Sequence, residues 1–124
     1  MKVTVYAKTG CELCQSIIKA FESHASKGLL IAEVEKVVFP NWNDPQAPSP
    51  SETERKRVSD AQADMIANDL YDTPAVSVAV DGKQIWGAHT VHSLQQVPFA
   101  TIWRASQGSQ KDLDLLRSSA SSGI

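Results

Sequence analysis

The sequence is poor in cysteine, in net charge and in long apolar stretches. Its 124 residues contain two cysteines, Cys11 and Cys14, which excludes a framework of stabilising disulfides. A formal net charge of −2 gives no reason to expect nucleic acid or an anionic membrane as a partner. No segment approaches the roughly 20 apolar residues of a membrane span, and residues 1–6 alternate in polarity, unlike a signal peptide. We therefore expect a cytoplasmic protein in a reducing compartment, with no nucleic acid and no membrane as partner.

The length and composition predict one globular α/β domain. Apolar residues make up 42% of the chain and charged residues 21%, as in an ordinary soluble domain. The periodicity of the apolar residues predicts a βαβ unit, whose strands are parallel, followed by an αββα arrangement with an Asp-Gly hairpin. Together they give a mixed four-stranded sheet flanked by helices. The predicted strands are 2–7, 29–39, 75–80 and 83–86, and the predicted helices are 11–26, 51–70 and one that begins at Thr90 and is interrupted at Pro98.

Two segments lie outside this pattern. Residues 40–50 contain four prolines and are predicted to form an inserted irregular loop, whose Trp42 either anchors it or contacts a partner. Residues 105–124 are rich in Ser, Gln and Gly, and this composition favours a flexible tail over a short docking helix through the leucines at 113, 115 and 116. The predicted domain therefore spans residues 1–104.

The two cysteines are separated by Glu12 and Leu13 and directly follow the first predicted strand. A dithiol with this spacing, between a strand and a helix, is typical of a redox site. The unpaired N–H groups and the positive end of the helix dipole at the helix start favour thiolate over thiol at Cys11. Cys14 lies one turn on, in register with the apolar stripe of the helix. We therefore predict that Cys11 is the exposed nucleophile and Cys14 the shielded resolving thiol.

Two other uses of the pair are open from the residues alone. A CxxC can be half of a zinc site, but such a site needs a second ligand pair, for which only His89 and His92 are candidates. A purely structural disulfide is the weaker alternative, because closing so short a loop adds little stability. We expect no resident metal.

The run from Val3 to Gln15, VTVYAKTGCELCQ, resembles the thioredoxin superfamily in its glutaredoxin branch, and is especially similar to the glutaredoxin-like hydrogen donors of ribonucleotide reductase. The Thr73-Pro74 pair before the predicted hairpin strengthens the resemblance, which covers roughly residues 2–94. It implies a thioredoxin-like fold. It also implies that Pro74 is cis and packs against the dithiol, and that the backbone of Thr73 pairs with an extended substrate segment.

The resemblance implies further substrate-binding residues. Lys8 matches a lysine that contacts a glutathione carboxylate or stabilises the thiolate, although a plain surface lysine is an equal alternative. Trp86 matches a tryptophan of the reductase donors. The family's Gly-Gly and acidic residue are replaced here by the segment 87–90, GAHT, which puts glutathione binding in doubt. His89 in that segment either assists proton transfer or is a surface histidine.

These features predict a dithiol–disulfide oxidoreductase that reduces protein disulfides and, by resemblance, supplies ribonucleotide reductase. No tightly bound cofactor is expected. An external reductant must regenerate the pair, either an NADPH-linked thioredoxin reductase or glutathione. The alternative from another class is a redox-switched binding module that uses the same fold without turnover. A third alternative is a metal cluster bound through Cys11 together with a second copy of the chain.

Overall fold

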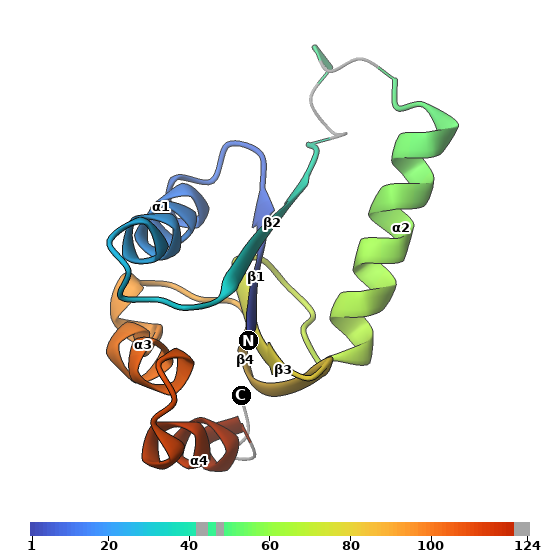
Figure 1. The fold of residues 1–124 in the computed structure, drawn as a ribbon. Helices are drawn as coiled ribbons and strands as arrows, with labels where there is room; N and C mark the ends of the chain where they lie inside the picture. Colours follow the sequence, from blue (N-terminus) through green and yellow to red (C-terminus); the bar gives the residue numbers. More distant parts are fainter. Residues whose placement is uncertain (42–44, 47–48, 121–124) are drawn as a thin grey trace.

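The computed structural model describes residues 1–41, 45–46 and 49–120, and the predicted role of Trp42 lies outside them. Figure 1 shows a central sheet with helices on both sides. The elements in chain order are β1 (Lys2–Lys8), α1 (Glu12–Ser26), β2 (Glu33–Phe39), α2 (Glu52–Ala67), β3 (Ala75–Val80), β4 (Lys83–Ala88), the short 3₁₀ helix η1 (Leu94–Gln96), α3 (Phe99–Ser106) and α4 (Gln110–Ala120).

The sheet has the strand order β2-β1-β3-β4. β1 pairs with β2 in parallel, because α1 carries the chain back across the sheet, whereas β3 is antiparallel to both of its neighbours. The β3–β4 hairpin turns at Asp81 and Gly82, whose φ angles of 52° and 78° lie in the left-handed region that Asp and Gly tolerate best. The predicted mixed sheet and thioredoxin-like fold are confirmed.

One face of the sheet is covered by α1, α3 and α4 (Figure 1). Alternate residues of β1 point to this face and are fully buried. The apolar side chains of α1 lie in one stripe along the helix, and this stripe packs against the sheet. The main core therefore lies between this face and these three helices. Its buried residues are Val3, Val5, Ala7, Cys14, Ile17, Ile18, Phe21, Leu30, Val76, Val78, Ile85, Trp86, Val91, Val97, Ile102, Ala105 and Leu116.

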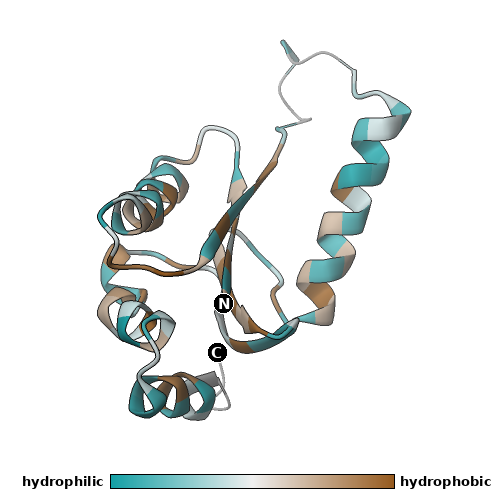
Figure 2. Cartoon of the chain, in the orientation of Figure 1, coloured by the Kyte–Doolittle hydropathy of each residue, from teal (hydrophilic) through white to brown (hydrophobic). Residues whose placement is uncertain are grey.

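The opposite face carries α2 alone (Figure 1). Ser51 caps this helix by accepting a hydrogen bond from the Glu54 N–H at 3.1 Å, as its Ser-x-x-Glu pattern predicts. Within α2 only Val58 and Met65 are buried, and Figure 2 shows a mostly hydrophilic helix surface. The small cluster beneath it consists of Tyr6, Met65, Leu70 and Ala75.

The C-terminal segment corrects one prediction. Residues 105–124 were expected to form a flexible tail, but α4 begins at Gln110 and packs against α3 and β4. The side chain of Leu116 is 1% exposed and Leu113 packs beside the main core, so the leucines three residues apart form an apolar face. That face outweighs the polar composition of the segment. Residues 121–124 lie outside the described part of the chain.

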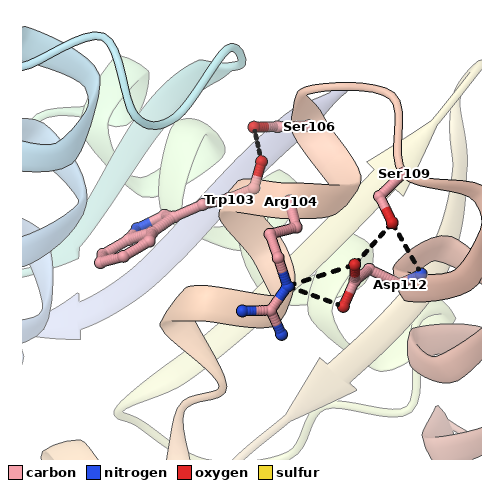
Figure 3. A network of polar contacts seen from close by, with 5 residues as sticks. All are labelled: Trp103, Arg104, Ser106, Ser109 and Asp112. Atoms are coloured by element: carbon pink, nitrogen blue, oxygen red, sulfur yellow. Dashed lines mark hydrogen bonds and ion pairs between the residues drawn. The ribbon is translucent and has the colours of Figure 1, made fainter.

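A polar network fixes the start of α4 (Figure 3). The Ser109 hydroxyl donates to Asp112 Oδ2 at 2.6 Å and accepts from the Asp112 N–H at 3.3 Å. Arg104 Nε donates to both carboxylate oxygens of Asp112 at 3.2 Å. The hydrogen bond from Ser109, with a contribution from Arg104, holds the pKa of the Asp112 carboxyl below its ordinary value, although burial opposes this. The network therefore links α3 to α4.

Other predicted elements are also shorter than expected. The strand predicted over 29–39 begins at Glu33, because the N–H groups of Leu29 and Leu30 donate to the His24 carbonyl and complete the end of α1. The helix predicted from Thr90 is reduced to η1, and α3 starts only after Pro98. Within the described residues, no helix is long and apolar enough to cross a membrane.

Candidate redox site

Cys11 and Cys14 form a disulfide at the junction of β1 and α1. Gly10, with φ at 84°, provides the tight turn that follows β1, and Cys11 is then the N-cap of α1. One helical turn brings the Cα atom of Cys14 to 5.3 Å from that of Cys11, within the range that a disulfide needs. The fold therefore presents the two sulfurs to each other, which is compatible with a redox-active CxxC site.

The N-cap position determines the electrostatics at Cys11. The Cys14 N–H donates to Cys11 Sγ at 3.1 Å, in the way that a serine or aspartate oxygen would accept at this position. A thiolate at Cys11 retains this donor and adds the attraction of the helix dipole. In the reduced protein, this local structure would favour a thiolate at Cys11.

The two sulfur-bearing residues differ in burial. Cys14 is 0% exposed and belongs to the main core, whereas Cys11 is partly exposed at its edge. This is the arrangement predicted from the apolar stripe of α1. An incoming disulfide reaches the sulfur of Cys11 more easily than that of Cys14.

The Thr73-Pro74 peptide bond is cis, as the resemblance implied. Tyr6 lies opposite Ala75 in the β1–β3 ladder, so Thr73 and Pro74 lie at the end of β1 that leads to Cys11. Pro74 is buried, and its carbonyl accepts a hydrogen bond from the Val91 N–H at 3.2 Å. The Thr73 N–H already donates to Asp72 Oδ1 at 2.8 Å. A substrate strand that pairs with Thr73 must therefore use its carbonyl or displace the Asp72 side chain.

The remaining predicted residues lie in three different environments. Lys8 is exposed at the end of β1, three residues before Cys11, whose N–H donates to the Lys8 carbonyl at 3.2 Å. Trp86 is 5% exposed and belongs to the main core. His89 accepts a hydrogen bond at Nδ1 from the Tyr71 N–H at 2.9 Å. Substrate contacts by these residues stay predictions.

A groove of about 410 Å³ lies beside Lys8 and Thr73, and the sequence did not predict it. Its walls are mostly apolar and come from the end of β2, from α2 and from the segment that follows α2. The sequence contained only a weak indication of this groove: Ile66 and Tyr71 are apolar, but they do not belong to the buried stripe of α2. We call this feature the apolar groove; its apolar lining residues are Phe39, Pro40, Met65, Ile66, Leu70 and Tyr71.

A larger crevice of about 670 Å³ lies between α2 and the sheet, and its lining reaches Lys2 at the opposite end of β1. Its charged lining is mixed and includes Arg57 and Asp60 of α2 and the ion pair of Lys2 with Glu35 at 2.5 Å. The hydrogen bond to Glu35 raises the pKa of Lys2. Burial raises the pKa of Tyr6, which also lines the crevice. Among the described residues the crevice and the groove share no lining residue, and Cys11 lies beyond the other end of β1.

In the described part of the chain, no group of three or more His, Cys, Asp or Glu side chains comes together in a way that could hold a metal ion. The zinc alternative required His89 and His92 as a second ligand pair, and Nδ1 of His89 is already engaged by the Tyr71 N–H. The structure thus provides no observation in favour of a zinc centre.

Comparison of the chain with protein-family models, with curated proteins and with solved structures gave no significant match. The fold and the cysteine geometry therefore carry the functional argument.

Proposed function

We propose that this protein is a dithiol–disulfide oxidoreductase of the glutaredoxin or thioredoxin type. The observation that carries the proposal is the Cys11–Cys14 pair at the start of α1, where a backbone N–H is directed at the partly exposed sulfur and the second sulfur is buried. A structural disulfide would gain little from so short a loop, whereas a nucleophile gains from each of these features.

In the proposed cycle, the Cys11 thiolate attacks one sulfur of a substrate disulfide. The substrate S–S bond breaks, its other sulfur leaves as a thiolate and takes a proton, and a mixed disulfide forms on Cys11. Cys14 then loses its proton and attacks Cys11 Sγ, which releases the second substrate thiol. The substrate gains two electrons, and the protein is left with the Cys11–Cys14 disulfide seen in the structure.

The cycle needs a reductant that returns two electrons to the pair. An NADPH-linked thioredoxin reductase or glutathione would supply them, and a disulfide-containing protein such as ribonucleotide reductase would be the acceptor. No tightly bound cofactor takes part in these steps, because both are exchanges between sulfur atoms.

The proposal is tested by following NADPH consumption with 2-hydroxyethyl disulfide as substrate. One vessel contains thioredoxin reductase, and the other contains glutathione and glutathione reductase. We expect turnover in at least one vessel, its reduction to the uncatalysed background in Cys11→Ser, and a trapped mixed disulfide in Cys14→Ser. Full activity of Cys11→Ser would overturn the proposal.

Absence of turnover in both vessels, with a Cys11–Cys14 disulfide that still forms and breaks reversibly, would point to the redox-switched binding module instead. Its signature would be a partner whose affinity differs between the oxidised and reduced protein.

A further inference from the structure

The apolar groove lies near the proposed redox site. Lys8 and Thr73 are among its lining residues, and both lie at the end of β1 that leads to Cys11. The Thr9 N–H donates to the Phe39 carbonyl at 3.0 Å, which ties the groove wall at the end of β2 to the turn before Cys11. A segment bound through its disulfide to Cys11 and lying along Thr73 would therefore come within reach of the groove.

Two side chains of the groove are exposed apolar groups. Ile66 is 58% exposed and Tyr71 is 64% exposed. Tyr71 is held from both ends: its hydroxyl donates to Asp69 Oδ1 at 3.0 Å, and its backbone N–H donates to His89 Nδ1 at 2.9 Å. A fixed aromatic wall loses little conformational freedom when it binds a partner, which favours its use in recognition.

The size and charge of the groove select among disulfide substrates. A volume of about 410 Å³ is at the lower end of the range for ligand sites, enough for one bulky side chain and its neighbouring backbone. Among the described lining residues, Lys8 and Asp72 are the charged ones, and they have opposite signs. Glutathione carries two carboxylates and an amine but no large apolar side chain, so it would leave the apolar walls unfilled.

We infer that the apolar groove receives a bulky apolar or aromatic side chain next to the half-cystine of an extended polypeptide substrate, and that Ile66 and Tyr71 determine this preference. The inference rests on the proposed function, because it names the substrate class of the same site. It assigns to α2 and to the segment 70–73 a recognition role in addition to their packing.

The test measures one reaction of the pre-reduced protein, so that no external reductant is needed. The protein is mixed with excess of a short peptide disulfide that has either Phe or Ser beside the cystine. The reaction is quenched with acid, the remaining thiols are alkylated, and the second-order rate constant is obtained from the oxidised fraction by mass spectrometry. We expect the Phe peptide to react about tenfold faster than the Ser peptide, since filling an apolar pocket gives roughly 10–200-fold discrimination.

Matched variants assign the preference to the groove. Ile66→Ser and Tyr71→Ser should each lower the Phe-to-Ser ratio of rate constants at least threefold. Ile31→Ser is the control, because Ile31 is 62% exposed, similar to Ile66, but lies before β2, where its N–H donates to Ser106 Oγ at 3.0 Å. It should retain the wild-type ratio.

The outcomes separate this inference from the proposed function. A wild-type ratio near one, or a ratio unchanged in both groove variants, would overturn the groove's role while 2-hydroxyethyl disulfide still oxidises the pair. If neither peptide nor 2-hydroxyethyl disulfide oxidises the reduced protein, the proposed function fails and the inference fails with it. An equal loss of the ratio in Ile31→Ser would show an effect of surface polarity in general and would also overturn the inference.

Discussion

The two faces of the sheet are built differently. On the face of α1, α3 and α4, interlocking apolar side chains form the large core that includes Phe21 and Ile102. On the face of α2, a small cluster around Met65 holds a largely hydrophilic helix, and a polar crevice of about 670 Å³ separates part of that helix from the strands. Figure 2 shows the contrast in the hydropathy of α1 and α2.

The difference separates the proposed chemistry, on one face of the sheet, from the proposed recognition, on the other. The disulfide is fixed at the start of α1, on the well-packed face, and proposed catalysis benefits from rigid support there. The apolar groove is bounded by α2, on the face with fewer buried contacts, where local opening costs less free energy. A rigidly supported disulfide beside the apolar groove would suit the proposed preference for a bulky apolar residue next to the cystine.

Truncating one core side chain on each face tests this comparison most strongly. Phe21 is 0% exposed, and we expect Phe21→Ala to lower the free energy of unfolding by about 3–5 kcal/mol. Met65 is 6% exposed beneath α2, next to the groove, and Met65→Ala should cost about 2 kcal/mol because its surroundings can collapse. Denaturation in urea, monitored by circular dichroism, measures both.

Ile31→Ala is the control for these two variants, because the Ile31 side chain is mostly exposed. Its truncation should change the free energy of unfolding by less than about 0.5 kcal/mol. Equal losses in Phe21→Ala and Met65→Ala would contradict the difference between the faces.

The same contrast explains why the sequence predicted α1 more accurately than α2. On the α1 face, local patterns agree with tertiary packing: the stripe through Ile17, Ile18 and Phe21 predicted the buried side of the helix, and the CxxC spacing predicted the disulfide. On the α2 face, the predicted helix continued to Leu70, but the helix ends at Ala67 and Leu70 reaches the small cluster from the following loop.

Two features of the structure differ from what the sequence favoured. The groove is assembled from the end of β2, from α2 and from residues 70–73, so no single window of sequence contains it. The α4 helix depends on Leu116 reaching the main core and on the Ser109–Asp112 cap, whereas the polar composition of residues 105–124 favoured a tail. Composition averages over a segment, but two correctly spaced leucines are sufficient for docking.

Removing a helix cap on each face should lower the free energy of unfolding by less than truncating a core side chain. It extends the comparison of the two faces to the starts of α4 and α2. Ser109 caps α4 within the network of Asp112, which is 6% exposed, so Ser109→Ala should cost about 1–2 kcal/mol of unfolding free energy. Ser51 caps the exposed start of α2, and Ser51→Ala should cost about 0.5–1 kcal/mol. The two variants are compared in the same urea titration, and a larger loss at Ser51 would show that α2 contributes more to global stability than its packing indicates.

The smallest expected effect is a dependence of stability on pH at the contact between α1 and α3. The His24 ring lies edge-on to Trp103 at 4.5 Å and to Phe99 at 5.4 Å between ring centroids, and its Nδ1 has no hydrogen-bond partner in the described part of the chain. Burial, with a smaller contribution from Lys27, lowers the pKa of His24 below its ordinary value.

Because the folded state holds His24 at a lower pKa than the unfolded chain does, the neutral ring favours folding. Its contribution is complete above the unfolded pKa of about 6.5, falls as the pH drops through that value, and reaches its lower limit below the pKa of the folded protein. Unfolding in urea at pH 7.5 and pH 5.5 should therefore show a loss of stability at pH 5.5 that is smaller in His24→Phe. Asp112, whose lowered pKa withdraws stability only at more acidic pH, does not interfere in this range. An identical loss in wild type and His24→Phe would show that the α1–α3 contact accommodates a charged imidazole, and that the well-packed face is less rigid at its edge than at Phe21.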